Sequence, residues 1–467
     1  MSDPRLPSRA RFLRSRANLD AWRSARRYDP PVTLVEAEIA QRPVTMQPVG
    51  RAPGRLAATI GVHYTVDAFA FVIVALLPLL TTRLGLVPWQ VATLLAAGSV
   101  CSGAIQPLVA WLSDLYDTRM FATLGLLVAV ISIGLIGFVD SFAMLLAVQC
   151  LSSAGIGAFH PPAAAVTGQL SGAKRTLGVS CFFLAGMLGS TSGNLVSPLW
   201  VRAFSPIVDG TPMVVHGLRA LVWFVIPGLM AVALLRWAIH DVPHAPVGAR
   251  ESHARLSRGE RRRRWSAVGL LYVGAALRFI ANLALVYLYV KWTQQYTLAQ
   301  AGATELTEAL GLRASALNGV LQGSMPIGMG VGGLAAGFLL RAHHEKLALV
   351  LVPMFGAGAI MLAPMAGDLG AGAIPAAVGI AMLAGLGFGS MVPVAISLAQ
   401  RLLPHRTGLA SSLMLGGAWM FAAVGPFFVD WAESRVGLRG AFTLTAAILL
   451  VAGLIGIALP GRTIREA

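Results

Sequence analysis

The chain has 467 residues, of which 56% are hydrophobic and 12% are charged, and its mean hydropathy is +0.71. A soluble domain carries about 25% charged residues, so this composition excludes an ordinary water-soluble protein. The formal net charge of +16 is typical of nucleic-acid binders, but the basic residues follow a membrane topology instead, and we expect no nucleic-acid partner.

Residues 1–55 form the first segment and hold 11 arginines and 5 acidic residues. Such a segment cannot bury an apolar core, so we expect a disordered cytoplasmic tail. Because basic residues are attracted to anionic lipid at a membrane surface, the tail is also a candidate lipid-binding segment. It lacks the apolar core of a secretory signal, so we expect the first span to direct membrane insertion.

Twelve apolar runs follow, each long enough to cross about 30 Å of hydrocarbon as a helix. Spanning strands need only about 10 residues and alternate in polarity, so unbroken runs favour helices. The predicted fold is all-α and integral to the membrane, with twelve transmembrane helices. The runs lie at residues 57–82, 88–112, 121–139, 142–170, 177–205, 217–239, 266–292, 314–340, 347–367, 373–400, 408–432 and 439–460.

The lysines and arginines are distributed unevenly between the two sides of this topology. Of 36, 28 fall on the side that holds both ends of the chain, 7 fall on the opposite side, and Arg278 lies within a run. This positive-inside pattern predicts that both termini are cytoplasmic. We expect an N-terminal six-helix bundle at 56–240, a basic cytoplasmic linker at 241–265, a C-terminal six-helix bundle at 266–460 and a short cytoplasmic tail at 461–467.

A weak internal repeat supports two bundles. Gly155 and Gly157 recur as Gly385 and Gly387, and "KRTLGVSCFFLAG" from residue 174 aligns with "HRTGLASSLMLGG" from residue 405, an offset of 231 residues (405 less 174). Duplicated bundles are common in transporters.

Two groups of six helices with a basic central linker resemble the major facilitator superfamily. The loop "AWLSDLYDTRM" is similar to the superfamily motif G-x-x-x-D-R-x-G-x-R-R at Asp114 and Arg119, and it departs from that motif at Leu115, among other positions. The resemblance implies a cytoplasmic gate that includes Asp114, Arg119 and Arg406, and alternating access around a cavity lined by spans one, four, seven and ten.

Four segments together resemble the fosmidomycin-resistance family of that superfamily. They are "HYTVDAFAFVIVALLPLL" from His63, the pair Gln106 and Pro107, "GIGAFHPPAAA" from Gly155 and "RTGLASSLMLG" from Arg406. The resemblance covers about residues 57–460 and implies drug efflux.

Ionisable residues inside spans are candidate functional residues, because burying one costs about 2.5–3.5 kcal/mol at the membrane centre. With a rise of about 1.5 Å per residue, His63, Asp67, His160 and Arg278 all fall within the same central slab. Asp67 follows His63 by one helical turn, so the two side chains can share a proton.

Three further features complete the candidate site. Pro161 and Pro162 remove backbone donors, and we expect them to kink span four and direct His160 into a wet cavity. Arg278 stays charged, so it needs Asp67 or an anionic substrate as its partner. Asn282, one turn from Arg278, and Gln106 are expected to contribute hydrogen bonds to solute. The alternative for each residue is a purely structural role.

The buried ionisable residues therefore predict a proton-coupled transporter of the bacterial inner membrane, and the family resemblance implies that it exports a small molecule or drug by antiport. A proton-coupled importer or facilitator is the first alternative, and a transport-inactive sensor or scaffold is the second. No P-loop, HExxH or G-x-S-x-G motif occurs, so we expect no enzyme activity, no cofactor and no metal. The expected partners are a small-molecule substrate, protons and membrane lipids, and we expect a monomer.

Overall fold

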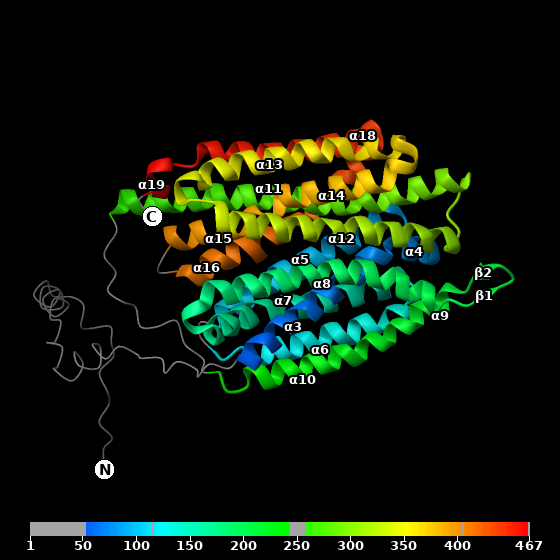
Figure 1. Cartoon of the computed structure of the whole chain (residues 1–467), viewed down its shortest axis with the longest axis horizontal. Helices are drawn as coiled ribbons and strands as arrows, with labels where there is room; N and C mark the ends of the chain where they lie inside the picture. Colours follow the sequence, from blue (N-terminus) through cyan, green and yellow to red (C-terminus); the bar gives the residue numbers. More distant parts are fainter. Residues whose placement is uncertain (1–52, 114–115, 243–256, 404–405, 466–467) are drawn as a thin grey trace, which may run out of the picture. The chain divides into compact units, whose positions relative to one another are not determined.

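The computed structural model of the protein describes residues 53–113, 116–242, 257–403 and 406–465. In these residues the structure is helical apart from short connections and one two-stranded hairpin (Figure 1). Nine helical stretches in the described residues are long and apolar enough to cross a membrane. Two of the nine run for 58 and 50 residues, from Glu345–Leu402 and Leu409–Ala458, so the expected number of twelve spans stays a prediction.

The described residues of 53–242, which we call the N-terminal part, contain eight α-helices. Their bounds are α3 Pro53–Ala70, α4 Val72–Leu84, α5 Pro88–Ser113, α6 Arg119–Leu135, α7 Phe142–Leu170, α8 Arg175–Ala203, α9 Val214–Arg219 and α10 Val225–Ile239. Short 3-10 helices span Ile136–Phe138, Gly172–Lys174 and Ala220–Phe224. The hairpin pairs β1 (Ile207–Val208) with β2 (Thr211–Pro212) in antiparallel register.

Residues 257–465, which we call the C-terminal part, contain the remaining described α-helices. Their bounds are α11 Arg258–Ala301, α12 Glu308–Leu339, α13 Glu345–Leu362, α14 Ala373–Gly389, α15 Met391–Leu402, α16 Thr407–Ser412, α17 Ala418–Met420, α18 Val424–Ile455 and α19 Gly461–Arg465. Shorter 3-10 segments span Ala342–His344, Ala363–Gly372, Phe421–Ala423 and Gly456–Ala458, and a π-helical turn spans Leu413–Gly417.

Two glycines break the long helical stretches of the C-terminal part. Gly370 has φ 55° and ψ −120°, and Gly437, inside α18, has φ 69° and ψ 175°. Because a side chain disfavours positive φ, glycine lets the helical conformation be interrupted at these two points.

Helix α11 begins seven residues before the expected end of the basic linker at residue 265. Ser257 caps it by accepting a hydrogen bond from the backbone N–H of Glu260 at 3.2 Å, and the Glu260 carboxylate binds Arg264 at 2.8 Å one turn later. Local capping and ion pairing therefore extend the helix into charged sequence. Residues 1–52 of the tail predicted at 1–55, and residues 243–256 of the linker predicted at 241–265, lie outside the described residues. The domain boundaries stay predictions.

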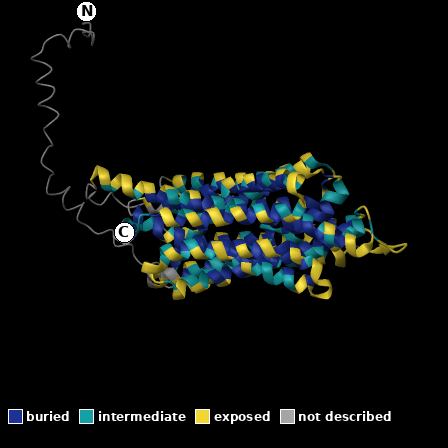
Figure 2. Cartoon of the chain, turned by 90° about the horizontal axis from the view of Figure 1, so that it is seen from above, coloured by how far each residue is buried: buried dark blue, intermediate teal, exposed yellow. Residues whose placement is uncertain are grey.

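The outward faces of the helices are apolar, as expected for a membrane protein. Figure 2 shows buried residues in dark blue where helices meet and exposed residues in yellow along the outside. The exposed side chains include Trp223, Met230, Phe338 and Leu369, each more than half accessible. Exposed apolar surface on this scale is compatible with lipid and unfavourable in water.

Side-chain hydrogen bonds join the N-terminal and C-terminal parts toward the helix ends remote from Pro53. They link α4 to α12, α5 to α11 and α8 to α12. The pairs are Leu79 N–Ser315 Oγ at 3.0 Å, Asn318 Nδ2–Val74 O at 2.8 Å, Arg83–Glu308 at 3.4 Å, Tyr287 OH–Pro88 O at 3.0 Å and Thr191 Oγ1–Gly323 O at 2.9 Å.

Candidate transport site

His63 and Asp67 lie one turn apart on α3, and both are buried, with 4% and 7% of their surface exposed. His63 Nε2 lies 3.5 Å from Asp67 Oδ2. His160, on α7, approaches the other carboxylate oxygen, with its Nε2 3.3 Å from Asp67 Oδ1. The structure therefore brings three of the predicted site residues together, with one carboxylate between two imidazoles.

Backbone carbonyls fix which nitrogen of each ring faces the carboxylate. His63 Nδ1 donates to the Phe182 carbonyl at 2.6 Å, and His160 Nδ1 donates to the Ile156 carbonyl at 2.7 Å. Since a carbonyl can only accept, each Nδ1 carries a proton. A neutral ring then presents its unprotonated Nε2 toward Asp67.

This arrangement limits how many further protons the three side chains hold. If both Nε2 atoms were unprotonated and the carboxylate were ionised, the lone pairs of nitrogen and oxygen would repel each other. At least one proton must therefore lie between an Nε2 atom and an oxygen of Asp67. One added proton makes the group neutral overall, and a second makes it +1. Among the described residues His63 Nε2 has no hydrogen-bond partner, which leaves a position for the second proton.

Helix α7 runs without interruption from Phe142 to Leu170 through Pro161 and Pro162. The two prolines still remove the N–H groups that would bond the carbonyls one turn earlier. The expected kink stays a prediction. His160 lies directly before them, and its side chain is 22% exposed, against 5% for His63 and 11% for Asp67.

Two residues of α8 complete the surroundings of His63 and were not predicted. The Phe182 ring stacks on the His63 ring, with centroids 3.8 Å apart and planes at 9°. Gly186 lies so close that a Cβ there would be 2.5 Å from both Asp67 Oδ2 and His63 Cε1. The alignment of Gly186 with Gly417 in the internal repeat was the one available sequence signal for it.

Arg278 and Asn282 are both buried on α11, with 4% and 8% exposed. In the described part of the chain Arg278 forms no ion pair, and its Nε has no hydrogen-bond partner. The expected contact with Asp67 is therefore not formed, because that carboxylate faces the two histidines instead. The other expected partner of Arg278, an anionic solute, stays a prediction.

Gln106 lies on α5 at a contact with the C-terminal part. Its side-chain amide binds Ser102 Oγ at 3.3 Å, and its Cβ would be 2.6 Å from a Cβ at Gly416. It is 8% exposed, so its expected role in solute binding stays a prediction.

The three residues expected to form a gate are not brought together by any contact among the described residues. Asp114 lies outside the described residues, and Arg406 is exposed just before α16. Arg119 binds Asp117 and also donates to the carbonyls of His240 at 2.9 Å and Val242 at 2.5 Å. These contacts place a cation at the carboxyl end of α10, where it is favourable.

Residues 60–374 match the family model of the Major Facilitator Superfamily. The chain belongs to the Major Facilitator Superfamily. It is accordingly a multi-pass membrane protein of a transporter superfamily.

Two curated relatives and one solved structure show the range of this likeness within the superfamily. The chain is 25% identical over 179 residues to the fosmidomycin resistance protein of Escherichia coli (strain K12), covering 38% of this chain and 41% of that one. It is 26% identical over 194 residues to the uncharacterized MFS-type transporter YfnC of Bacillus subtilis (strain 168), covering 41% and 44%. The aligned part thus spans less than half of each relative. The predicted resemblance to the fosmidomycin-resistance family is confirmed.

The solved structure is a bacterial homolog of the human lysosomal transporter Spinster, in an inward-facing and unoccupied conformation. Its TM-score is 0.67 at 16% identity, with 89% of this chain and 99% of that chain covered. At this identity the likeness shows the superfamily fold alone.

Among the described residues of this transporter, His63, Asp67 and His160 are the group that could hold a metal ion, with ligand atoms within 4.8 Å of one another. Two imidazoles and a carboxylate suit divalent transition metals. However, each histidine contacts a different oxygen of Asp67 directly. The same approach of each imidazole to the carboxylate also permits direct proton sharing.

Proposed function

We propose that this transporter exports a small anionic molecule in exchange for protons across the bacterial inner membrane. The observation that carries the proposal is the Asp67 carboxylate held between His63 and His160 inside a membrane-spanning bundle, at 3.5 and 3.3 Å. A buried group that holds either one or two added protons can load a proton on one side and release it on the other.

Arg278 supports an anionic solute. A guanidinium stays protonated, and leaving it buried without a counterion is costly. A solute carboxylate, phosphate or phosphonate would supply the missing acceptors. Asn282, one turn further along α11, would add a neutral hydrogen bond to the same solute.

The energetics favour export of such a solute. A membrane potential of 100 mV, negative inside, contributes about 2.3 kcal/mol for each charge, and it drives an anion outward as well as a proton inward. Each pH unit adds about 1.36 kcal/mol for one proton. One exchanged proton therefore sustains a solute gradient of more than tenfold. The name of the Escherichia coli relative, which refers to resistance, agrees with export.

The test is transport of fosmidomycin by the purified protein in proteoliposomes with an imposed pH gradient. Antiport predicts that solute leaves vesicles against its gradient when the outside is acidic, and that this stops when the gradient is collapsed. Solute movement with the proton gradient would identify an importer, and movement independent of pH would identify a facilitator. Absence of movement for a panel of small organic anions would favour the sensor or scaffold alternative.

A further inference from the structure

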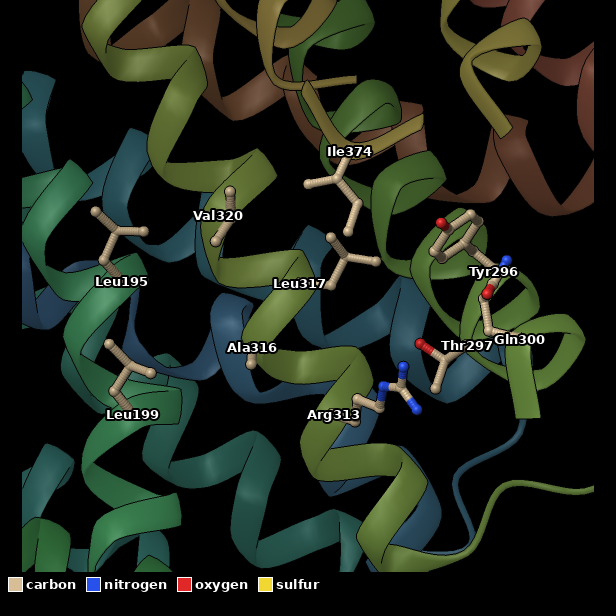
Figure 3. Close-up of a pocket in the computed structure, with 10 residues that line it drawn as sticks. All are labelled: Leu195, Leu199, Tyr296, Thr297, Gln300, Arg313, Ala316, Leu317, Val320 and Ile374. Atoms are coloured by element: carbon tan, nitrogen blue, oxygen red, sulfur yellow. The ribbon is translucent and has the colours of Figure 1, made fainter. Parts of the chain in front are cut away.

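A pocket of about 310 Å³ opens beside α8, α11, α12 and α14, away from the His63–Asp67–His160 group. Figure 3 shows Tyr296, Thr297, Gln300 and Arg313 on one side of it, and Leu195 and Leu199 on the opposite side. A pocket that is polar on one side and apolar on the other matches an amphiphilic ligand.

Arg313 is the charged residue of this lining, and it is exposed. It forms no ion pair or hydrogen bond with any other described residue. The acidic side chain at the start of the same helix, Glu308, is already paired with Arg83 at 3.4 Å. Arg313 is therefore free to bind an anion.

The depth of the lining residues separates a headgroup position from a chain position. Arg313 is five residues into α12, about 8 Å from its first residue at a rise of about 1.5 Å per residue, and Val320 is about 18 Å from it. The polar side chain thus lies near the end of the helix, where lipid headgroups lie. The apolar lining reaches hydrocarbon depth at Val320 and at Leu195, which lies eight residues before the end of α8, about 12 Å from it.

We propose that this pocket binds an anionic phospholipid, with its phosphate on Arg313 and an acyl chain against Leu195 and Val320. A soluble anion would leave the apolar side in contact with water, whereas a phospholipid covers both sides. Because α8 belongs to the N-terminal part and the other lining helices belong to the C-terminal part, the lipid bridges the two and stabilises the arrangement in which they meet here. This proposal stands independently of the transported solute and of proton coupling.

The experiment is native mass spectrometry of the purified transporter after addition of phosphatidylglycerol or phosphatidylcholine. Arg313→Gln is expected to lower retention of phosphatidylglycerol about fivefold, which corresponds to about 1 kcal/mol for one basic side chain near a membrane surface. Arg435→Gln removes another exposed arginine from α18, outside the pocket lining, and is expected to retain the lipid as the unchanged protein does.

A second variant tests the apolar side. Ala316→Phe fills the pocket while keeping Arg313, and it is expected to lower retention of both lipids. Melting temperatures of all variants in detergent identify any variant that does not fold. If Arg313→Gln does not fold, Arg313→Lys replaces it. Its lipid retention is expected to lie between that of the unchanged protein and that of Ala316→Phe. Equal loss in Arg313→Gln and Arg435→Gln would overturn the proposal, as would displacement of the lipid by inorganic phosphate alone, which would identify a site for soluble anions.

Discussion

The N-terminal and C-terminal parts have similar close helix contacts but different buried charges. In the N-terminal part, Gly155 on α7 packs against the Gly125 carbonyl of α6. In the C-terminal part, Gly387 on α14 packs against Gly356 of α13. The N-terminal part buries a carboxylate with two histidines, whereas the C-terminal part buries one arginine without a counterion among the described residues. The proposed function therefore assigns proton binding to one half of a duplicated helix framework and solute binding to the other.

Arg278→Gln tests the separation of these roles and is expected to have the largest effect. Removing a charge-assisted hydrogen bond costs about 1.5–3 kcal/mol, so we expect KM for an anionic solute to rise about 10- to 150-fold. Uptake measurements over a range of solute concentrations give this value. Asn282→Ala, which removes a neutral group on the same helix, should raise KM less. An unchanged KM in Arg278→Gln would mean that the arginine has a structural role.

Gly186→Ala tests the geometry around Asp67. Its Cβ would lie 2.5 Å from Asp67 Oδ2 and from His63 Cε1, so one helix or the side-chain pair must move. Overpacking costs about 1–3 kcal/mol, which predicts a loss of pH-driven transport of about 5- to 150-fold. Gly61→Ala on α3 is the matched control, because nothing lies within 4 Å of its Cβ position. If the two variants transport equally well, the close packing around Asp67 is unimportant.

The two histidines should differ in their effects. His160 is the most exposed of the three side chains, so His160→Gln is expected to slow proton-driven transport by about tenfold, below the range of about 100- to 10,000-fold for a full acid–base catalyst. His63 is more deeply buried and stacks on Phe182, so His63→Gln should lower the melting temperature more than His160→Gln does. Initial rates at several pH values and thermal melts of both variants check this. Identical behaviour would contradict the expected difference between the exposed His160 and the buried His63.

Removing an exposed ion pair near the start of α3 should have the smallest effect. Arg55, near the start of α3, binds Asp241 and donates to the Ala238 carbonyl at 2.9 Å. The Arg55 guanidinium lowers the pKa of the Asp241 carboxyl. The stability that this pair adds is therefore present above the ordinary aspartate pKa and is lost as the pH falls through the lowered value. Asp241→Asn should leave transport at neutral pH unchanged and should only weaken the decrease of melting temperature in acid.

The sequence predicted those parts of the site that depend on helical periodicity and depth. The proximity of His63 and Asp67 follows from their spacing of four on one helix, and His160 was found because it interrupts an apolar run. The missing contact between Arg278 and Asp67 shows the limit of this approach: equal depth in the membrane fixes one coordinate only, and the direction in which each helix face points comes from packing.

Contacts between helices could also not be predicted from the sequence. Phe182 and Gly186 look like ordinary residues of an apolar span, and their importance appears only when α8 packs on α3. The pocket at Arg313 similarly depends on four helices, and the apolar pattern of the sequence does not show which helices lie side by side. The superfamily and the helical class were predicted correctly because they rest on length, composition and motif.

The most direct test of the central claim is proton movement in proteoliposomes that contain Asp67→Asn, compared with Asp140→Asn. Asp140 is an exposed carboxylate between α6 and α7, and its replacement should leave transport unchanged. A pH-sensitive dye inside the vesicles should report a proton flux on addition of solute for the unchanged protein and for Asp140→Asn. Asp67→Asn should give no proton flux while still exchanging labelled for unlabelled solute. Retention of the proton flux in Asp67→Asn would contradict the account.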